Sequence, residues 1–317
     1  MERRFLDFLE IAPRSSKPRS RGLTGVNDQG YPTPWLREML AAYSDHIDGV
    51  KFTPTTLPMP WDVIEGRVKA YRDYKVDVKI DDPIFAIAYY QGKADQLLRT
   101  LAQIGFTHVQ IDTEHVAAGK KGGPARAGED ESRYMSLARE LGLRVEGEVG
   151  KKWKEGDLAR AEGGLLNVEA IVSETRRLLS AGCEKVYFES RVLREAIGDY
   201  GEKERGGQQV RQVVEGVGLD NIVFEVTWQM PWDTRQCHRF WLVRNFGPDV
   251  NIAGAGTIDE VRFIEAIRRG LTFVSGPSKA SSKLWIKSLA KGGGKAAEDW
   301  WKEDYPIDPS FAQPLRS

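Results

Sequence analysis

The sequence predicts a closed barrel of eight parallel strands wrapped by helices, an α/β fold, on three observations. Eight short apolar runs recur at near-even intervals along the 317 residues. Stretches with helical start and stop signals separate the runs, a pattern typical of right-handed βαβ crossovers and a parallel sheet. Most runs end in a charged residue, and the carboxyl ends of the strands are where a (β/α)8 TIM barrel carries its active site.

Each predicted strand is a short, mostly apolar run, as expected for a strand buried on both faces. The runs are residues 23–26, 49–50, 76–80, 108–111, 143–145, 185–188, 221–224 and 250–253. The charged residues at or just after their ends are Asp28, Lys51, Asp81 with Asp82, Asp112, Glu148, Glu189 and Glu225. We therefore expect a ring of carboxylates with one lysine at the mouth of the barrel.

Helix boundaries between these strands follow from capping residues. Asn167 precedes a helical stretch over 168–180, and Thr257 with Glu260 fits a capping box for a helix over 257–269. Two further stretches, 94–104 and 131–141, each end at a glycine, the residue that most often terminates a helix. These are the helices expected on the outside of a barrel.

Three segments interrupt the alternation of strands and helices. Residues 120–130 are rich in Gly, Lys and acidic residues, and both an active-site loop and a solvated insertion fit them. Residues 155–164 form a second candidate lid. We expect one barrel domain with an N-terminal arm over 1–290, followed by an irregular, aromatic-rich C-terminal extension over 291–317 that packs on the barrel or on a neighbouring subunit.

The composition favours a small-molecule substrate. Lysine and arginine number 46 and aspartate and glutamate 46, so the net charge gives no reason to expect a nucleic-acid or membrane partner. No apolar stretch reaches the roughly 20 residues of a membrane span. The two cysteines, Cys183 and Cys237, provide no disulfide framework. We expect a cytoplasmic protein.

Several short motifs resemble the phosphosulfolactate synthase family, which also includes plant heat-stress-associated homologues. They are Ile47-Asp48-Gly49-Val50-Lys51-Phe52, Glu148-Val149-Gly150-Lys151-Lys152, Phe188-Glu189-Ser190-Arg191 and Val223-Phe224-Glu225. Together with weaker matches they extend over roughly 18–270. The resemblance implies a barrel enzyme that adds sulfite to phosphoenolpyruvate with the help of Mg²⁺. By analogy with other barrels we also expect a homo-oligomer.

The resemblance also implies roles for the matched residues. Lys51 is the candidate general acid. Glu148, Glu189 and Glu225 are candidate Mg²⁺ ligands, with Asp112 or Asp82 added, and Glu148 also counts among the candidate catalytic residues. Lys151 and Arg191 are candidates for binding the anionic end of the substrate, and Asp28 is a further candidate substrate-binding residue. The same charges would equally form a network of ion pairs that stiffens the barrel mouth.

The sequence departs from the family where the substrate would bind. Residues 53–57 read Thr-Pro-Thr-Thr-Leu in place of a glycine-rich turn, and Asp81 and Asp82 replace glycines. After the fourth strand, Asp112 is followed by His115, which as an imidazole fits a general base, a metal ligand or an ordinary loop residue. The Gly254-x-Gly256 turn before a helix remains as a candidate anion site.

These features together predict a metal-assisted lyase or synthase that acts on a small carboxylate through an enolate-like intermediate. The added negative charge at the mouth favours a substrate altered from that of the family. An isomerase or dehydratase acting on a larger, less anionic substrate is the alternative within enzymes. A non-catalytic, stress-related homologue is the alternative outside them.

Overall fold

The computed structural model describes residue 8 and residues 14–111, 123–150 and 165–271, with the backbone alone over 123–129. Among the predicted site residues, Asp112, His115 and Lys151 lie outside the described residues. The candidate lid over 155–164 and the predicted C-terminal extension over 291–317 also lie outside them.

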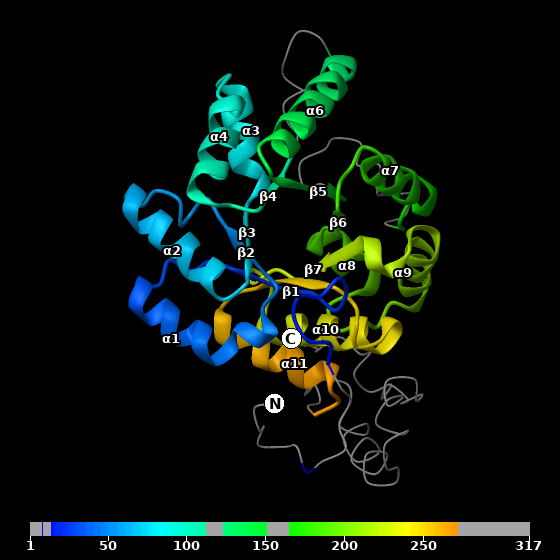
Figure 1. The fold of residues 1–317 in the computed structure, drawn as a ribbon. Coiled ribbons are helices and arrows are strands. Elements are labelled where there is room, and N and C mark those ends of the chain that lie inside the picture. Colours follow the sequence, from blue (N-terminus) through cyan, green and yellow to red (C-terminus); the bar gives the residue numbers. More distant parts are fainter. Residues whose placement is uncertain (1–7, 9–13, 112–122, 151–164, 272–317) are drawn as a thin grey trace, which may run out of the picture.

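Eight parallel strands close into a barrel in chain order, with β8 pairing with β1 (Figure 1). They are β1 Thr24–Asn27, β2 Gly49–Phe52, β3 Asp77–Ile80, β4 His108–Gln110, β5 Arg144–Val149, β6 Lys185–Phe188, β7 Ile222–Glu225 and β8 Ile252–Ala255. The predicted fold is confirmed, and so is the existence of all eight strands. Several strands extend further than the apolar runs, so Lys51, Glu148 and Glu225 lie inside strands rather than after them.

Helices surround the barrel, and two of them follow β3 and two follow β6 (Figure 1). They are α1 Thr33–Tyr43, α2 Trp61–Asp73, α3 Asp82–Tyr90, α4 Ala94–Ile104, α6 Gly123–Glu140, α7 Val168–Ser180, α8 Ser190–Ile197, α9 Glu204–Val217, α10 Trp232–Phe246 and α11 Val261–Arg268. Short 3₁₀ turns are η1 Ser44–His46, η3 Leu219–Asn221 and η4 Ile258–Glu260. No described helix combines the length and the apolar character that a membrane span requires.

Most of the predicted helix boundaries hold. The Asn167 side chain accepts a hydrogen bond from the Ala170 amide and caps α7, and α4 ends at Gly105, whose φ of 99° suits glycine. The loop predicted over 120–130 is wrong from residue 123 onward, because α6 already begins there. Its Ala, Arg and Glu residues are good helix formers, and they outweigh the glycines that suggested a loop.

The capping box predicted for the last helix is also wrong. Thr257 makes no side-chain bond to the helix amides and donates instead to Asp259 Oδ1 at 2.6 Å. The Glu260 carboxylate accepts from the Gly256 amide at 2.6 Å, one residue before the expected cap position. The chain therefore enters α11 through the 3₁₀ turn η4.

The main hydrophobic core lies between the strands and the helices rather than inside the barrel. Phe52, Phe188 and Phe224 are fully buried members of it. Tyr187, Val223 and Ala253 form a separate small apolar cluster. Many of the other strand side chains of alternate register are polar or charged and buried: Asn27, Lys51, Lys79, Gln110, Glu146 and Glu225. The lumen of this barrel is therefore polar along much of its length.

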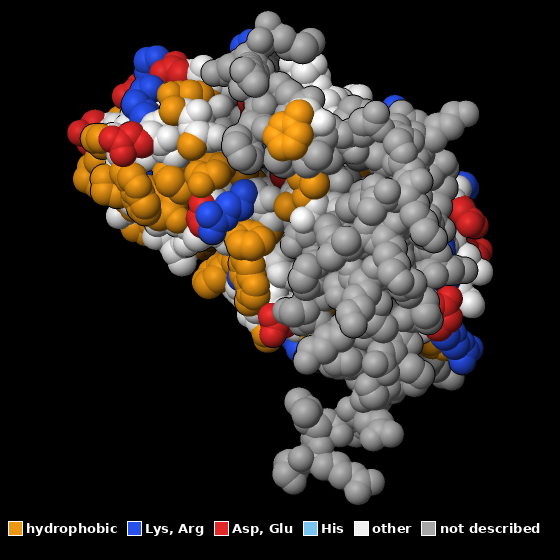
Figure 2. Space-filling view, turned by 90° about the horizontal axis from the view of Figure 1, so that it is seen from below, with side chains coloured by type: hydrophobic (Ala, Val, Ile, Leu, Met, Phe, Trp, Pro, Cys, Tyr) orange, Lys and Arg blue, Asp and Glu red, His pale blue; other side chains and the backbone are white. Residues whose placement is uncertain are grey.

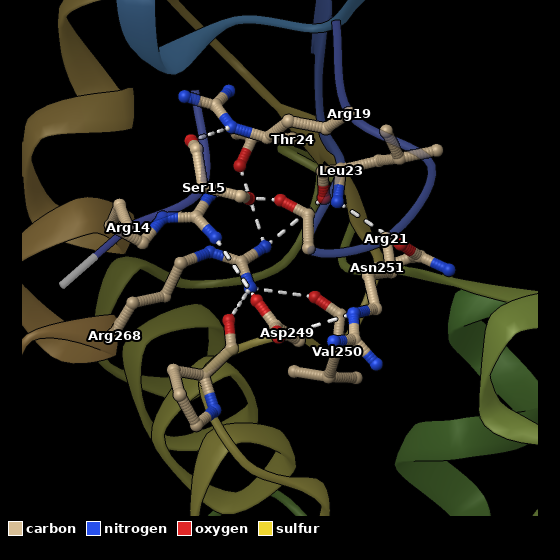
Figure 3. Close-up of polar contacts among 12 residues, drawn as sticks. Arg14, Ser15, Arg19, Arg21, Leu23, Thr24, Asp249, Val250, Asn251 and Arg268 are labelled. Atoms are coloured by element: carbon tan, nitrogen blue, oxygen red, sulfur yellow. Dashed lines mark hydrogen bonds and ion pairs between the residues drawn. The ribbon is translucent and has the colours of Figure 1, made fainter. Parts of the chain in front are cut away.

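A buried arginine ties together the chain segments that enter β1 and β8 at the amino-terminal end of the barrel. Arg268 on α11 donates to the carbonyl oxygens of Val250 at 2.6 Å, Leu23 at 3.0 Å and Pro248 (Figure 3). Arg14, from the segment before β1, forms an ion pair with Glu265 at 3.0 Å. These bonds join the start of the described chain to its last helix.

A cavity of about 140 Å³ opens at this same end. Its lining includes Lys79, Glu146 and Tyr187 but none of Lys51, Glu148 and Glu225. The cavity therefore enters the lumen from the end opposite the predicted active site.

Aromatic side chains are exposed where two helices begin. Trp35 at the start of α1 and Trp61 at the start of α2 are about half exposed, at 46% and 50%. Trp35 also packs edge-to-face with Tyr31, and the centroids of the two rings are 4.3 Å apart. Figure 2 shows hydrophobic side chains gathered on the side of the molecule that carries α1 and α2 in Figure 1. Because α1 and α2 begin near the carboxyl ends of the strands, Trp35 and Trp61 lie on the mouth side of the barrel.

Candidate active site

Lys51 is held between carboxylates from two other strands. Its Nζ lies 2.8 Å from Glu225 Oε1 on β7 and 3.2 Å from Asp81 Oδ1, which follows β3. The lysine and Glu225 are buried, and only 19% of the Asp81 side chain is exposed. Because β2 and β7 are not neighbours in the sheet, the Lys51–Glu225 pair spans the lumen.

The surrounding carboxylates keep Lys51 charged. Burial by itself lowers the pKa of the ammonium, but the negative charges of Glu225, Asp81 and Glu148 outweigh it. The net effect raises the pKa of Lys51 well above its usual value. The free site therefore holds a cation whose proton is released less readily than that of an ordinary lysine.

Glu148 on β5 is a carboxyl group whose neutral, protonated form is favoured. Burial, together with the nearby charges of Asp82 and Glu225, raises its pKa well above the usual value, and Lys51 only partly opposes this. Gln110 on β4 donates a hydrogen bond to Glu148 Oε2. Glu148 therefore keeps its proton at pH values at which an exposed glutamate has lost it.

Glu189 directly follows β6 and caps α8. Its Oε2 accepts from the Arg191 amide at 2.7 Å, and its Oε1 accepts from Ser190 Oγ at 3.0 Å. It is fully buried, and its charge contributes to the raised pKa of Glu148. The predicted metal ligand therefore lies at the mouth, with its carboxylate also stabilising the start of a helix.

Two predicted substrate-binding residues have their side chains in other contacts. Asp28 is buried, bonds to Arg67, accepts from the Tyr71 hydroxyl at 3.0 Å and accepts from the Gly30 amide at 2.9 Å. The Arg191 side chain is about half exposed and pairs with Glu195 one turn along α8 at 3.0 Å. Asp28 therefore supports the barrel wall, whereas the guanidinium of Arg191 faces solvent.

The predicted anion site after β8 is occupied by the protein's own carboxylate. The amide of Gly256 is bonded to Glu260, and Glu260 in turn accepts from Arg239 Nη1 at 2.6 Å. Arg235 Nε lies 3.5 Å from the same carboxylate. A substrate anion would have to displace Glu260 to reach this amide.

The described residues contain no group of three or more His, Cys, Asp or Glu side chains arranged to hold a metal ion. Lys51 engages Glu225 and Asp81, and the amide of Arg191 engages Glu189. Glu148, which accepts a hydrogen bond from Gln110, and Asp82 are two further mouth carboxylates, and the charge of Asp82 contributes to the raised pKa of Glu148.

Sequence reasoning missed several polar residues of the lumen. Each lies two positions before a charged strand-end residue and therefore deeper in the lumen: Lys79, Gln110, Glu146 and Tyr187. The available signal was the two-residue alternation of strands, because Glu146 and Glu148, or Lys79 and Asp81, share one face of the sheet. Asp81 has no predicted role at its strand end, and the structure shows it to be a partner of Lys51.

A (β/α)8 barrel with a buried lysine among carboxylates at its carboxyl-terminal end has the general plan of a barrel enzyme acting on a small molecule. Residues 12–273 match the family model described as (2R)-phospho-3-sulfolactate synthase (ComA). The chain belongs to the phosphosulfolactate synthase family.

Curated relatives agree with this assignment. The chain is 30% identical to the phosphosulfolactate synthase of Methanothermobacter thermautotrophicus over 84% of this chain and 95% of that protein. It is 28% identical to the enzyme of the same name from Methanocaldococcus jannaschii, over 79% of this chain and 92% of that protein. For the Bacillus subtilis phosphosulfolactate synthase the identity is 26%, over 84% of this chain and 96% of that protein. These are lyase-type enzymes, and the family's reaction type is the starting point for this chain.

Proposed function

We propose that this protein is a metal-assisted lyase that adds a small nucleophile to an enol-type carboxylate, with sulfite and phosphoenolpyruvate as the first pair to test. The observation that carries the proposal is the buried Lys51 ammonium between Glu225 and Asp81. A fixed cation there lies where an anionic substrate at the barrel mouth would develop negative charge.

The chemistry places two demands on the site. The sulfur lone pair of sulfite forms a bond to the methylene carbon of phosphoenolpyruvate, and the electrons of the double bond move onto the carboxylate as an enediolate. A proton must then reach the phosphate-bearing carbon. Lys51 can hold the developing charge, and among the residues that the structure describes at the mouth, Lys51 and Glu148 carry a proton to give.

The donor set suits a hard divalent cation. Glu148 and Asp82 offer carboxylate oxygens, and Mg²⁺ commonly binds through one or two carboxylates while it keeps several waters. When bound, such a cation would stabilise negative charge on the substrate carboxylate. Glu148 would then be ionised, leaving Lys51 as the proton donor.

The described carboxylates at the mouth carry less net negative charge than their number in the sequence indicates. Asp81 is paired with Lys51, and Glu148 tends to stay protonated, so the mouth is less anionic than a residue count indicates. This supports the family's substrate.

The turn after β2 supports the second candidate, a lyase with an altered substrate. The carbonyl of Thr53 accepts from both the amide and the hydroxyl of Thr56, at 3.0 and 3.1 Å. The Thr53 and Thr55 hydroxyls lie 2.7 Å apart. This turn therefore satisfies its own polar groups instead of presenting the backbone of a glycine-rich turn.

Incubation with phosphoenolpyruvate, sulfite and Mg²⁺, followed by mass spectrometry, tests the proposal. We expect phosphosulfolactate to form, and its formation to be lost in Lys51→Met. A wild-type protein that binds Mg²⁺ by calorimetry but forms no adduct would favour the altered substrate. Mg²⁺ binding that survives unchanged in Glu148→Gln would contradict the assignment of the metal ligand.

A further inference from the structure

Tyr187 on β6 lies inside the lumen next to two lysines of the opposite wall. Lys51 Nζ is 5.7 Å from the centroid of its ring, and Lys79 Nζ is 4.6 Å from the same centroid. Lys79 also donates to the Tyr187 hydroxyl oxygen, so it approaches from the hydroxyl end of the ring. One aromatic ring therefore contacts both the ammonium at the mouth and a second ammonium deeper in the barrel.

A buried ion pair fixes the hydroxyl end of this ring. Lys79 Nζ is 2.9 Å from each carboxylate oxygen of Glu146, and both side chains are buried. Burial, with the charge of Glu146, raises the pKa of Tyr187 to about 12, so the phenol stays neutral. The neutral ring is bonded to a lysine whose own position is set by two further bonds.

The other surroundings of Tyr187 are small and apolar. It packs with Val223 and Ala253, apart from the main hydrophobic core. All three residues line the cavity that opens at the amino-terminal end of the barrel. The cavity lining does not include Lys51 or Glu225, so the layer formed by Tyr187, Lys79 and Glu146 separates this cavity from the mouth.

We propose that Tyr187 is a positioning residue for Lys51: its ring, anchored from below by Lys79 and Glu146, holds the ammonium at the mouth of the barrel. A cation within about 6 Å of a ring centroid is attracted by the quadrupole of the ring, most strongly where water is excluded. The ring also separates the charge of Lys51 from that of Lys79. The role in turnover rests on the proposed function, whereas the restraint on the side chain does not.

The test compares Tyr187→Leu, which removes the ring, with Tyr187→Phe, which keeps the ring and removes the bond to Lys79. Tyr134→Phe, at a buried tyrosine on the outer helix α6, is the matched control. The first measurement is the NMR order parameter of the Lys51 side chain at Cε, assigned with Lys51→Arg. We expect it to fall clearly in Tyr187→Leu, to fall less in Tyr187→Phe and to stay unchanged in Tyr134→Phe.

The second measurement is sulfite addition. We expect kcat to fall about tenfold in Tyr187→Leu, with KM within about twofold, because a tenfold change in rate corresponds to about 1.4 kcal/mol, which lies within the range of a desolvated cation–π contact. Tyr187→Phe should recover most of the loss. A wild type without sulfite addition would count against sulfite and phosphoenolpyruvate as the substrate pair and leave this inference open to test, because the order parameters still decide the role of Tyr187.

The order parameter of Lys51 decides against the proposal if Tyr187→Leu leaves it unchanged. If Tyr187→Leu does not fold, Tyr187→Phe becomes the deciding variant. An unchanged order parameter of Lys51 in Tyr187→Phe would overturn the anchoring of the ring by Lys79. A fall of equal size in Tyr134→Phe would also overturn the proposal, since it would reflect general loosening of the fold.

Discussion

Lys51 and Glu225 face each other across the lumen of the barrel, with 2.8 Å between Nζ and Oε1. The pair is buried and joins two strands that are not neighbours in the sheet. It therefore fixes the shape of the mouth as well as its charge, and changes to either residue act on stability and on chemistry together.

Replacement of Lys51 by methionine should abolish turnover and lower the free energy of unfolding by about 3 kcal/mol, because the buried Glu225 carboxylate loses its ion pair with the ammonium. Urea denaturation measures the second effect. The double variant Lys51→Met/Glu225→Gln should recover part of the stability and none of the activity. Full activity in Lys51→Met would exclude the lysine from the reaction.

Glu148→Gln should make the protein more resistant to alkaline conditions. The folded pKa of Glu148 is raised, so the unfolded chain loses this proton first, and the free energy of unfolding falls as the pH rises above about 4.5 toward the folded pKa. The amide has no proton to lose, so the stability gained by the variant should grow with pH over this window. Urea titrations between pH 5 and 9 measure it, with the exposed Glu38→Gln as control.

Glu265 should contribute to acid unfolding. Burial raises its pKa, but the charges of Arg14 and Arg269 outweigh burial and lower the pKa to about 2. Its stabilisation is therefore complete above the unfolded value and is lost as the pH falls from about 4.5 to 2, by about 3 kcal/mol at most. Glu265→Gln should remove this part of the acid dependence. As a control, Glu195→Gln, which removes the exposed ion pair with Arg191, should change the free energy of unfolding by less than about 1 kcal/mol.

Arg268→Met should destabilise the fold by about 3 kcal/mol, since the carbonyl oxygens of the buried Val250 and the partly buried Leu23 would each lose a donor. Arg268→Lys should recover only part of this, because one ammonium cannot reproduce the planar fork of a guanidinium. The exposed Arg262→Met on the same helix should stay within about 0.5 kcal/mol. Thermal unfolding of the three variants measures the series.

The sequence carried enough information for the fold because apolar runs and helix caps are local signals. The run over 185–188 coincides with β6, and Asn167 caps α7 as its position predicted. The error at Thr257 arose because a capping box is only one use of its residues. Glu260 is drawn instead to Gly256 and Arg239, a contact that depends on how α10 packs beside η4.

The candidate site was only partly predictable for a related reason. Strand ends identify which charges gather at the mouth, and Lys51, Glu225 and Glu148 do so. They do not tell which charge pairs with which across the lumen. Asp28 lies at a strand end like the others, yet the buried Arg67 takes up its carboxylate, and nothing in the spacing of these two residues indicates the pair.

The polar lumen has a consequence for how this barrel can change. In a barrel filled with branched aliphatic side chains, the residues on the axis also supply much of the hydrophobic stabilisation. Here the main apolar core lies outside the ring of strands, while Lys79, Glu146 and Tyr187 occupy the axis. Coordinated exchange of charged partners along the axis can therefore alter the chemistry at the mouth while the apolar shell that keeps the chain folded remains intact.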